Sequence, residues 1–386
     1  MTGQSVQFGV LGPLQITVDG NPIALGTPKQ RAVLAVLLMN RNRPVSVDAL
    51  VTAAWADAAP AGARASLHSY VSNLRKLLST AAAEPEATLA SAPPGYRLTV
   101  SETALDLGRF TTEKAAGFRA AAAGEFGLAS RHLAAALAEW RGPVLEDLQD
   151  FEFVDALATA LSEDRLSAVT AHAEAEIACG RAGEVLGALE TLTAEHPYRE
   201  PLWAQLISAY YLSERQSDAL EAYGRLKRNL ADELGIDPGP SLRDLYQKIL
   251  RQEPLDAKAS AKTAAVGNVT QLDQRTAMSA SSSTAYLEDP SGGQHPLRAV
   301  ATRIGRLDDN DIVLADAKVS RHHAAVIDTG TSYVISDLRS ANGIYVQHNR
   351  VQGSATLTEG DQIRICDYTF VFRTTTGTVR TTEGAQ

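Results

Sequence analysis

The spacing of apolar and polar residues over the first hundred positions predicts strands, then three helices, then a closing hairpin. "VQFGVLGPLQITVDGNPIAL" alternates as strands do, and "VDGNP" within it is typical of a hairpin turn. Thr27 precedes Pro28 as the N-cap of a first helix, and Ser46 is placed to cap a second. "PPGYRLTV" ends the segment as a turn and an alternating strand. The third helix carries its apolar residues on one stripe, at Leu67, Val71, Leu74 and Leu78.

The pattern changes twice more along the chain. Residues 101–252 are rich in Ala, Leu and Glu and helical throughout, and "GRAGEVLGAL" from Gly180 aligns with "ERQSDALEAY" from Glu214 at a spacing of 34 residues. That spacing is the period of tetratricopeptide (TPR) units. Residues 253–284 are rich in Ala, Ser and Thr without a period and predict a flexible linker. Residues 285–375 form short alternating runs between turn residues, which predict a β-sandwich.

Composition narrows the class of protein. A chain of 386 residues is too long for one ordinary core. Its two cysteines, Cys179 and Cys366, lie far apart and support neither a disulfide framework nor a zinc cluster. No apolar run approaches the roughly 20 residues that span a bilayer. The N-terminal residues lack the pattern of a secretory signal, so a cytoplasmic protein without membrane contact is expected.

Charge and helix pattern together indicate a nucleic-acid face. The net charge is -9, yet residues 27–76 hold 7 basic residues against 2 acidic ones. Hydroxyl, amide and cationic side chains lie opposite the apolar stripe of the third helix, or flank it, and suit a major groove. The alternative is an ordinary solvated surface helix. The candidate DNA-binding residues are Arg64, His68, Ser69, Ser72, Asn73, Arg75 and Lys76, with Arg97 in the closing hairpin.

Residues 7–100 resemble a known family. "GPLQITVDGNPIALGTPKQRAVLAVLLMNRNRPVSVDALVTAAW", "SLHSYVSNLRKLL" and "PPGYRL" are similar to the N-terminal domain of SARP-type transcriptional activators, a branch of the OmpR-like winged helices. "ADELGIDPGPSLRDLYQKIL" resembles the end of the bacterial transcriptional activation domain that follows it. The resemblance implies that the third helix reads DNA and that the hairpin is the wing. The helical segment is then either a partner-binding scaffold or a structural spacer.

A second set of polar residues recurs at predicted loops of the C-terminal sandwich. "RIGR", "VSRHH" and "SANGIYV" contribute fixed cations, hydroxyls and an amide, without a carboxylate paired to a nucleophile. Such groups suit a phosphate dianion and do not suit catalysis. Adjacent His322 and His323 would point to opposite faces of a strand, which disfavours a metal pair. The candidate phosphopeptide-binding residues are Arg306, Ser320, Arg321, Ser340 and Asn342.

The same pieces are similar to a forkhead-associated (FHA) domain, a phosphothreonine-binding β-sandwich. Its motif GR…SxxH…NG maps onto Gly305 with Arg306, Ser320 with His323, and Asn342 with Gly343. The resemblance implies that Arg306 and Ser320 hold the phosphate and that Asn342 fixes the peptide backbone. It implies structural roles for His323, Gly305 and Gly343. It also implies a docking partner, an autophosphorylated Ser/Thr protein kinase.

The chain is therefore predicted to be a multidomain α+β protein. Its expected parts are an OmpR-like winged helix (1–100), an all-α TPR-like activation domain (101–252), a flexible linker (253–284), an FHA β-sandwich (285–375) and a disordered tail (376–386).

The predicted function is a DNA-binding transcriptional activator controlled by Ser/Thr kinase signalling. Promoter DNA and a phosphothreonine protein are its expected partners, RNA polymerase is a further candidate, and self-association as a homodimer stays open. The alternative is a phosphopeptide adaptor with weak or lost DNA binding. An enzyme is disfavoured because the sequence lacks GxxxxGK[ST], GxSxG and HExxH motifs. No cofactor and no metal are expected.

Overall fold

The computed structural model divides the chain into two compact units. Unit 1 comprises Met1–Thr111, Glu139–Asp164 and Gln271–Gln386, and unit 2 comprises Thr112–Ala138 and Arg165–Thr270. The residues described are 6–56, 59–79, 88–280, 285–297, 301–307, 310–328, 333–338, 340–351 and 353–374. Within them, no helix combines the length and the apolar character that a membrane span requires.

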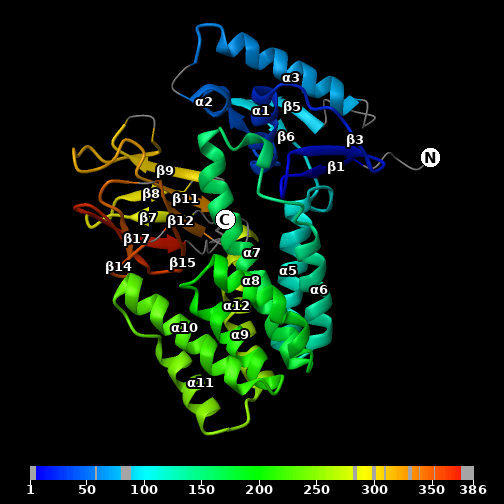
Figure 1. The fold of residues 1–386 in the computed structure, drawn as a ribbon. Coiled ribbons are helices and arrows are strands. Elements are labelled where there is room, and N and C mark those ends of the chain that lie inside the picture. Colours follow the sequence, from blue (N-terminus) through cyan, green and yellow to red (C-terminus); the bar gives the residue numbers. More distant parts are fainter. Residues whose placement is uncertain are drawn as a thin grey trace, which may run out of the picture. The chain divides into compact units, whose positions relative to one another are not determined.

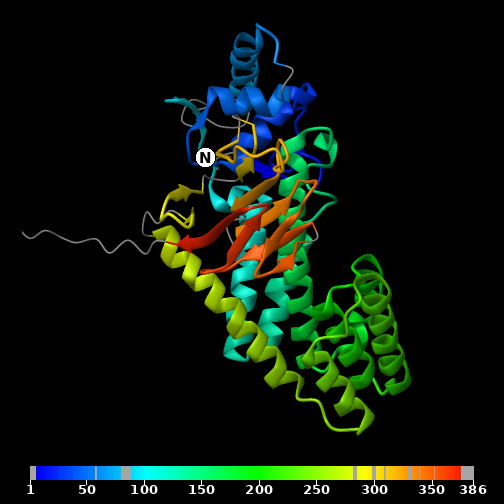
Figure 2. The same ribbon diagram turned by 90° about the vertical axis from the view of Figure 1, so that its left-hand side faces the viewer.

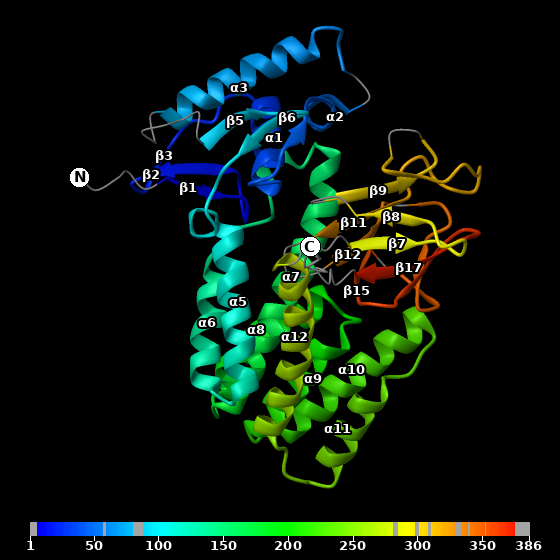
Figure 3. The same cartoon turned by 180° about the vertical axis from the view of Figure 1, so that it is seen from behind.

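The N-terminal part of unit 1 is a winged helix, drawn in blue to cyan in Figure 1 and seen from behind in Figure 3. The Thr27 side chain accepts a hydrogen bond from Gln30 N, and Ser46 accepts one from Ala49 N, so both predicted N-caps are confirmed. Its elements are β1 (Val6–Gly9), β2 (Gln15–Val18), β3 (Asn21–Pro22), α1 (Pro28–Met39), β4 (Val45–Ser46), α2 (Val47–Trp55), α3 (Ala63–Ser79), β5 (Leu89–Ala92) and β6 (Gly95–Leu98).

Two three-stranded sheets flank the helices of the winged helix. One has the order β1-β2-β3, and the other has the order β4-β6-β5. Ala90 pairs with Arg97 in the wing hairpin formed by β5 and β6. The predicted stripe on α3 is confirmed, because Leu67, Val71, Leu74 and Leu78 are all buried. Their burial leaves the polar side of α3 outside the core, which is the geometry that a recognition helix needs.

A buried carboxylate joins the first sheet to the helix that begins the next domain. Asp106 accepts hydrogen bonds from the backbone N–H groups of Val10 and Leu11, each at 2.9 Å, and pairs with Arg141 at 3.2 Å. The elements after the wing are a 3₁₀ helix (Glu102–Ala104), α5 (Asp106–Ala123), α6 (Phe126–Ala138), a second 3₁₀ helix (Glu146–Leu148) and α7 (Glu152–Ala178).

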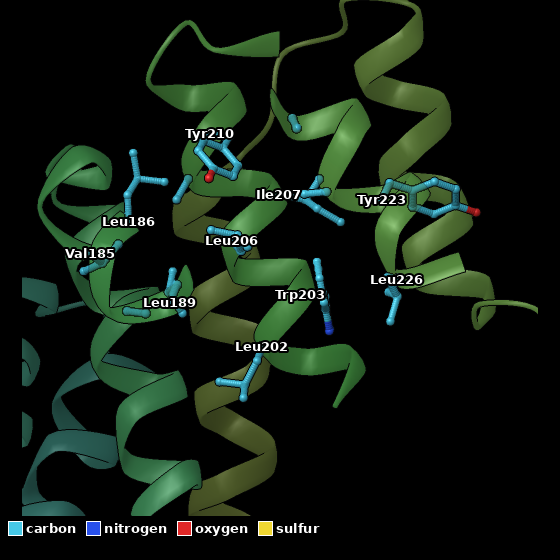
Figure 4. Packing of buried hydrophobic residues seen from close by; sticks show 14 of the residues in the cluster. Val185, Leu186, Leu189, Leu202, Trp203, Leu206, Ile207, Tyr210, Tyr223 and Leu226 are labelled. Atoms are coloured by element: carbon cyan, nitrogen blue, oxygen red, sulfur yellow. The ribbon is translucent and has the colours of Figure 1, made fainter. Parts of the chain in front are cut away.

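Unit 2 is helical, and its core is the cluster of apolar side chains shown in Figure 4. The predicted 34-residue repeat is visible in its turns. Gly180 and Glu214 both have positive φ, and the N–H of the following arginine reaches back five residues in each case, from Arg181 to Glu176 O and from Arg215 to Tyr210 O. The remaining elements are a 3₁₀ helix (Ala182–Val185), α8 (Leu186–Glu195), α9 (Glu200–Leu212), α10 (Gln216–Leu234), α11 (Pro240–Leu250) and α12 (Ala257–Ala280).

The prediction of a flexible linker over residues 253–284 is wrong for most of its length. Residues 257–280 form α12, and Ala261 and Ala265 are buried in a cluster with Ala175 and Ala178 of α7. Alanine has the highest helix propensity, and small side chains let helices approach closely. A composition typical of linkers therefore forms a packed helix here.

The C-terminal part of unit 1 is a β-sandwich, in yellow to red in Figure 2. One sheet has the order β10-β9-β11-β12-β15 and the other β14-β13-β16-β17-β7-β8, with a buried core between them. The predicted disordered tail (376–386) lies outside the described residues. The strands are β7 (Ala285–Glu288), β8 (Gln294–Pro296), β9 (Ala301–Gly305), β10 (Ile312–Val313), β11 (Ala324–Asp328), β12 (Tyr333–Asp337), β13 (Ile344–Val346), β14 (Asn349–Arg350), β15 (Ser354–Leu357), β16 (Gln362–Ile365) and β17 (Tyr368–Thr374).

Candidate functional site

Three loops of the sandwich that are distant in sequence are hydrogen-bonded to one another. They follow β9, precede β11 and join β12 to β13. Arg306 N–H donates to Ser320 O at 3.0 Å, and Ala341 N–H donates to the Ser320 hydroxyl at 3.1 Å. Ser340 closes its own loop, because its hydroxyl accepts from Gly343 N at 2.9 Å. The structure thus brings the three predicted loop motifs to one place. We call Arg306, Ser320, Arg321 and Asn342 the grip.

His323 braces the grip from inside. Its side chain is fully buried, Nδ1 accepts from Ser320 N–H at 3.0 Å, and Nε2 lies 3.2 Å from Gly343 O. Since Nδ1 accepts, the proton belongs on Nε2, which donates to the carbonyl oxygen. Both ring nitrogens are occupied, so the ring fixes the loop of Ser320 relative to that of Asn342 and Gly343.

Gly305 lies where β9 passes close to the loop of Arg321. A Cβ at this position would lie 2.2 Å from the backbone oxygen of Arg321 and 2.9 Å from Asn310 Nδ2. Asn310 is itself part of the support, because its amide donates to Leu307 O at 2.8 Å and to Arg321 O at 2.9 Å. Only glycine leaves room for this backbone approach.

The groups that face outward are cations and hydrogen-bond donors. Arg306 and Arg321 are exposed, and among the described residues no carboxylate forms an ion pair with either guanidinium. The Ser320 hydroxyl accepts one bond and retains its proton to donate. The Asn342 amide donates to Lys318 O at 2.7 Å and is exposed at the rim. Two unpaired guanidinium groups beside a hydroxyl and an amide can hold a dianion through charge-assisted hydrogen bonds.

Cys366 and His322 lie near the grip, and both are hydrogen-bonded. Burial raises the pKa of the Cys366 thiol, which donates to Lys318 O at 3.2 Å, so the thiol stays neutral. His322 is half-buried and hydrogen-bonded to Asn310 Oδ1. In the part of the chain that is described, no three His, Cys, Asp or Glu side chains gather as a metal site would require.

The predicted DNA-binding residues differ in their contacts within the protein. Ser69, Ser72 and Lys76 on α3 and Arg97 on the wing are exposed. His68 and Asn73 are exposed as well and Arg75 is half-buried, and all three bond to neighbouring elements: His68 Nδ1 to the Tyr96 hydroxyl at 2.7 Å, Asn73 to Gln30 at 3.3 Å, and Arg75 to Leu89 O at 2.9 Å and Ser91 Oγ at 3.0 Å. These three side chains join α3 to α1 and the wing. Arg64 pairs with Asp48, with both side chains more than two-thirds exposed at 71% and 78%.

Sequence reasoning overlooked several residues around the grip. Lys318 supplies the carbonyl oxygen that holds Asn342, while its ammonium pairs with Asp367 at 2.7 Å, which raises the pKa of Lys318. Arg350 lies against Gly343, with its Nε 2.8 Å from the position a Cβ would take. A signal existed for Lys318, which stands two positions before Ser320. Strand pairing and loop contacts bring Arg350 and Asn310 to the grip, and no pattern in the sequence indicates this.

Three family models match the chain in the order that the folds suggest. "Transcriptional regulatory protein, C terminal" matches residues 20–98, "Bacterial transcriptional activator domain" matches residues 105–250, and "FHA domain" matches residues 302–366. The transcriptional regulatory protein EmbR of Mycobacterium tuberculosis H37Rv is 65% identical over 374 residues, which cover 97% of this chain and 96% of that protein. The chain belongs to the EmbR family of transcriptional regulatory proteins. As a member of the EmbR family it is a transcriptional regulator, and the predicted three-domain fold class is confirmed.

Two further likenesses support the family. A solved structure of M. tuberculosis EmbR, described as a complex with a low-affinity phosphopeptide, superposes with a TM-score of 0.93 and covers 96% of this chain and 98% of that one, at 65% identity. The regulatory protein DnrI of Streptomyces peucetius is 34% identical over 254 residues, covering 64% of this chain and 93% of that protein. The match to DnrI supports the SARP resemblance.

Proposed function

We propose that this regulator docks on phosphothreonine through the grip, with Arg306 and Ser320 holding the phosphate. In the same proposal Arg321 adds a contact, Ser340 supports the loop and Asn342 binds the peptide backbone. The observation that carries the proposal is the set of unpaired Arg306 and Arg321 guanidinium groups near Ser320, whose backbone N–H donates to the buried His323. The phosphopeptide complex of EmbR supports it, since that protein has the same fold at 65% identity.

We further propose that the winged helix binds promoter DNA through Ser69, Ser72 and Lys76 of α3 and Arg97 of the wing. His68, Asn73 and Arg75 position α3 and the wing for this contact. The proposal includes activation of transcription, an autophosphorylated Ser/Thr kinase in the cytoplasm as docking partner, and RNA polymerase as the target of the helical domain. The proposal also includes homodimer formation and the absence of catalysis.

Replacing Arg306 with alanine tests the docking proposal. A fluorescent phosphothreonine peptide library is titrated against the full chain, with phosphoserine and unphosphorylated peptides beside it. Loss of one charge-assisted contact costs about 1.5–3 kcal/mol, so Arg306→Ala is expected to weaken phosphothreonine binding at least tenfold. Arg228→Ala removes the same charge from an exposed position on α10 and serves as the matched control. Equal binding of phosphorylated and unphosphorylated peptides would refute docking.

Replacing Arg97 with alanine tests the DNA proposal. The logarithm of the binding constant falls linearly with the logarithm of salt concentration, with a slope of about 0.9 per neutralised phosphate. Arg97→Ala is therefore expected to reduce that slope by about 1 and to weaken promoter binding similarly on all sequences. Anisotropy of labelled duplexes at several salt concentrations measures both. If the unaltered chain shows only weak and salt-independent DNA binding, the adaptor function is favoured instead.

A further inference from the structure

One face of the six-stranded sheet carries a row of three side chains that the proposed function does not use. Tyr345 of β13 is directly opposite Arg350 of β14 on one side and Arg364 of β16 on the other. Directly opposed residues of antiparallel strands lie on the same face. The Arg364 guanidinium carbon lies 4.0 Å from the centroid of the Tyr345 ring, which is a close cation–π contact. Both arginines are exposed and the tyrosine is half-buried.

The row is continuous with the grip through Gly343. The Arg350 Nε and Nη2 atoms lie 2.8 Å and 3.2 Å from the position of a Gly343 Cβ, so the guanidinium rests on the Gly343 backbone. Gly343 follows Asn342 directly, and its φ of +73° turns the chain into β13. Arg350 thus lies beside the residue that is proposed to hold the peptide backbone.

The two arginines of the row form no ion pair with the acidic residues that the structure describes. Other cations of the sandwich are neutralised: Lys318 pairs with Asp367 at 2.7 Å, and Arg373 pairs with Glu288 at 2.9 Å. Among the residues that the structure describes, the guanidinium groups of Arg350 and Arg364 form no ion pair and no intramolecular hydrogen bond. Two uncompensated charges on one face attract an anion, and the aromatic ring between them holds Arg364 in place.

We propose that Arg350 and Arg364, with Tyr345 between them, form a second anion subsite for the same bound peptide. The subsite takes an acidic side chain, carboxylate or phosphate, that lies a few residues from the phosphothreonine. An extended peptide advances about 3.3 Å per residue, so a ligand whose backbone is held at Asn342 can place a nearby side chain over the row. The inference rests on phosphothreonine docking by the grip and names the class of sequence that the grip selects.

The experiment uses the full chain and a phosphothreonine peptide with alanine at the neighbouring positions. A single aspartate is then moved through those positions in turn, and binding is followed by fluorescence anisotropy at low and high salt. One position is expected to strengthen binding about three- to tenfold at low salt and less at high salt, because exposed charge pairs are modest and screened. A second phosphothreonine at that position distinguishes phosphate from carboxylate recognition.

Variants test whether the gain in affinity from the aspartate depends on Arg350 and Arg364. The ratio of affinities for the aspartate and alanine peptides is expected to fall to about one in Arg350→Ala and to drop partly in Arg364→Ala. Arg350→Glu is expected to favour a lysine at the same position. Arg228→Ala should retain the full ratio. The subsite is refuted if the alanine peptide binds but no position gains, or if the gain persists in both arginine-to-alanine variants. Failure of the alanine phosphopeptide itself would instead refute docking, and the subsite with it.

Discussion

A chain in which Gly305 is replaced by alanine is expected to lose phosphothreonine binding because the sandwich can no longer close around its loops. The new Cβ would lie 2.2 Å from the Arg321 backbone oxygen, far inside van der Waals contact. The obstacle is backbone, so no flexible side chain can turn away. Overpacking of this kind costs about 3 kcal/mol or more.

The Gly305→Ala substitution is expected to disrupt the grip itself. To relieve the overlap, β9 must move away from the loop of Ser320 and Arg321. That movement breaks the bond from Arg306 N–H to Ser320 O, at 3.0 Å, and the bond from Leu307 N–H to Arg321 O, at 3.3 Å. Arg306 and Ser320 would then no longer face one phosphate.

Urea unfolding and peptide titration of the same preparation measure both effects. Gly187→Ala is the matched control, because Gly187 lies on α8 and its added Cβ meets nothing within 4 Å. That change is expected to be neutral or to stabilise the chain by up to about 1 kcal/mol. If Gly305→Ala retained its stability and its phosphopeptide affinity, the close approach of β9 to the Arg321 loop would be wrong.

The grip could be predicted from sequence because its residues lie in short loops with a recognisable order. Gly305 with Arg306, Ser320 with His323, and Asn342 with Gly343 each stand next to an alternating run that predicts a strand. Their assembly depends on long-range pairing, such as that of β11 with β9 and β12, which the alternation makes plausible and only the fold fixes. Arg350 was not predicted, because its approach to Gly343 also depends on strand pairing, that of β13 with β14.

Helical periodicity on α3 leaves the contacts of the polar side chains undetermined. Helical periodicity placed His68 and Arg75 beside the apolar stripe and suggested DNA contact. The structure joins them to the wing, His68 through Tyr96 and Arg75 through Leu89 O. A polar residue at the edge of a helical face can point to solvent or to a neighbouring element, and the period alone does not distinguish these. The linker prediction was wrong for α12 because an alanine-rich segment can form a flexible linker or a helix that packs against others. Composition alone does not distinguish the two.

Replacing Asp106 with alanine is expected to have a similarly large effect on the junction between the winged helix and α5. The carboxylate is only 3% exposed. It accepts from Val10 N and Leu11 N, whose residues are fully buried, and from Leu107 N at 2.8 Å. Burial raises the pKa of Asp106, while the backbone N–H donors and the Arg141 guanidinium oppose that rise. No sequence pattern predicts this role, since Val10 and Leu11 lie about a hundred positions away from Asp106 in the sequence.

Removal of the carboxylate leaves several donors without an acceptor. Each buried N–H group that loses its partner costs about 1–3 kcal/mol, and Arg141 loses its counter-ion. Asp106→Ala is therefore expected to destabilise unit 1 by about 3–5 kcal/mol. Asp106→Asn keeps one acceptor oxygen and should cost clearly less. Asp48→Ala is the matched control, because that carboxylate is 78% exposed and its pair with Arg64 contributes at most about 1 kcal/mol.

Urea unfolding and limited proteolysis of the full chain distinguish these expectations. An early transition and new cleavage near the end of β1 in Asp106→Ala, with a smaller change in Asp106→Asn, would establish that the carboxylate holds the sheet to α5. An Asp106→Ala chain as stable as Asp48→Ala would show that Val10 N and Leu11 N find other acceptors. The link between the two domains would then depend on the neighbouring pairs Arg41 with Glu102 and Arg31 with Asp147.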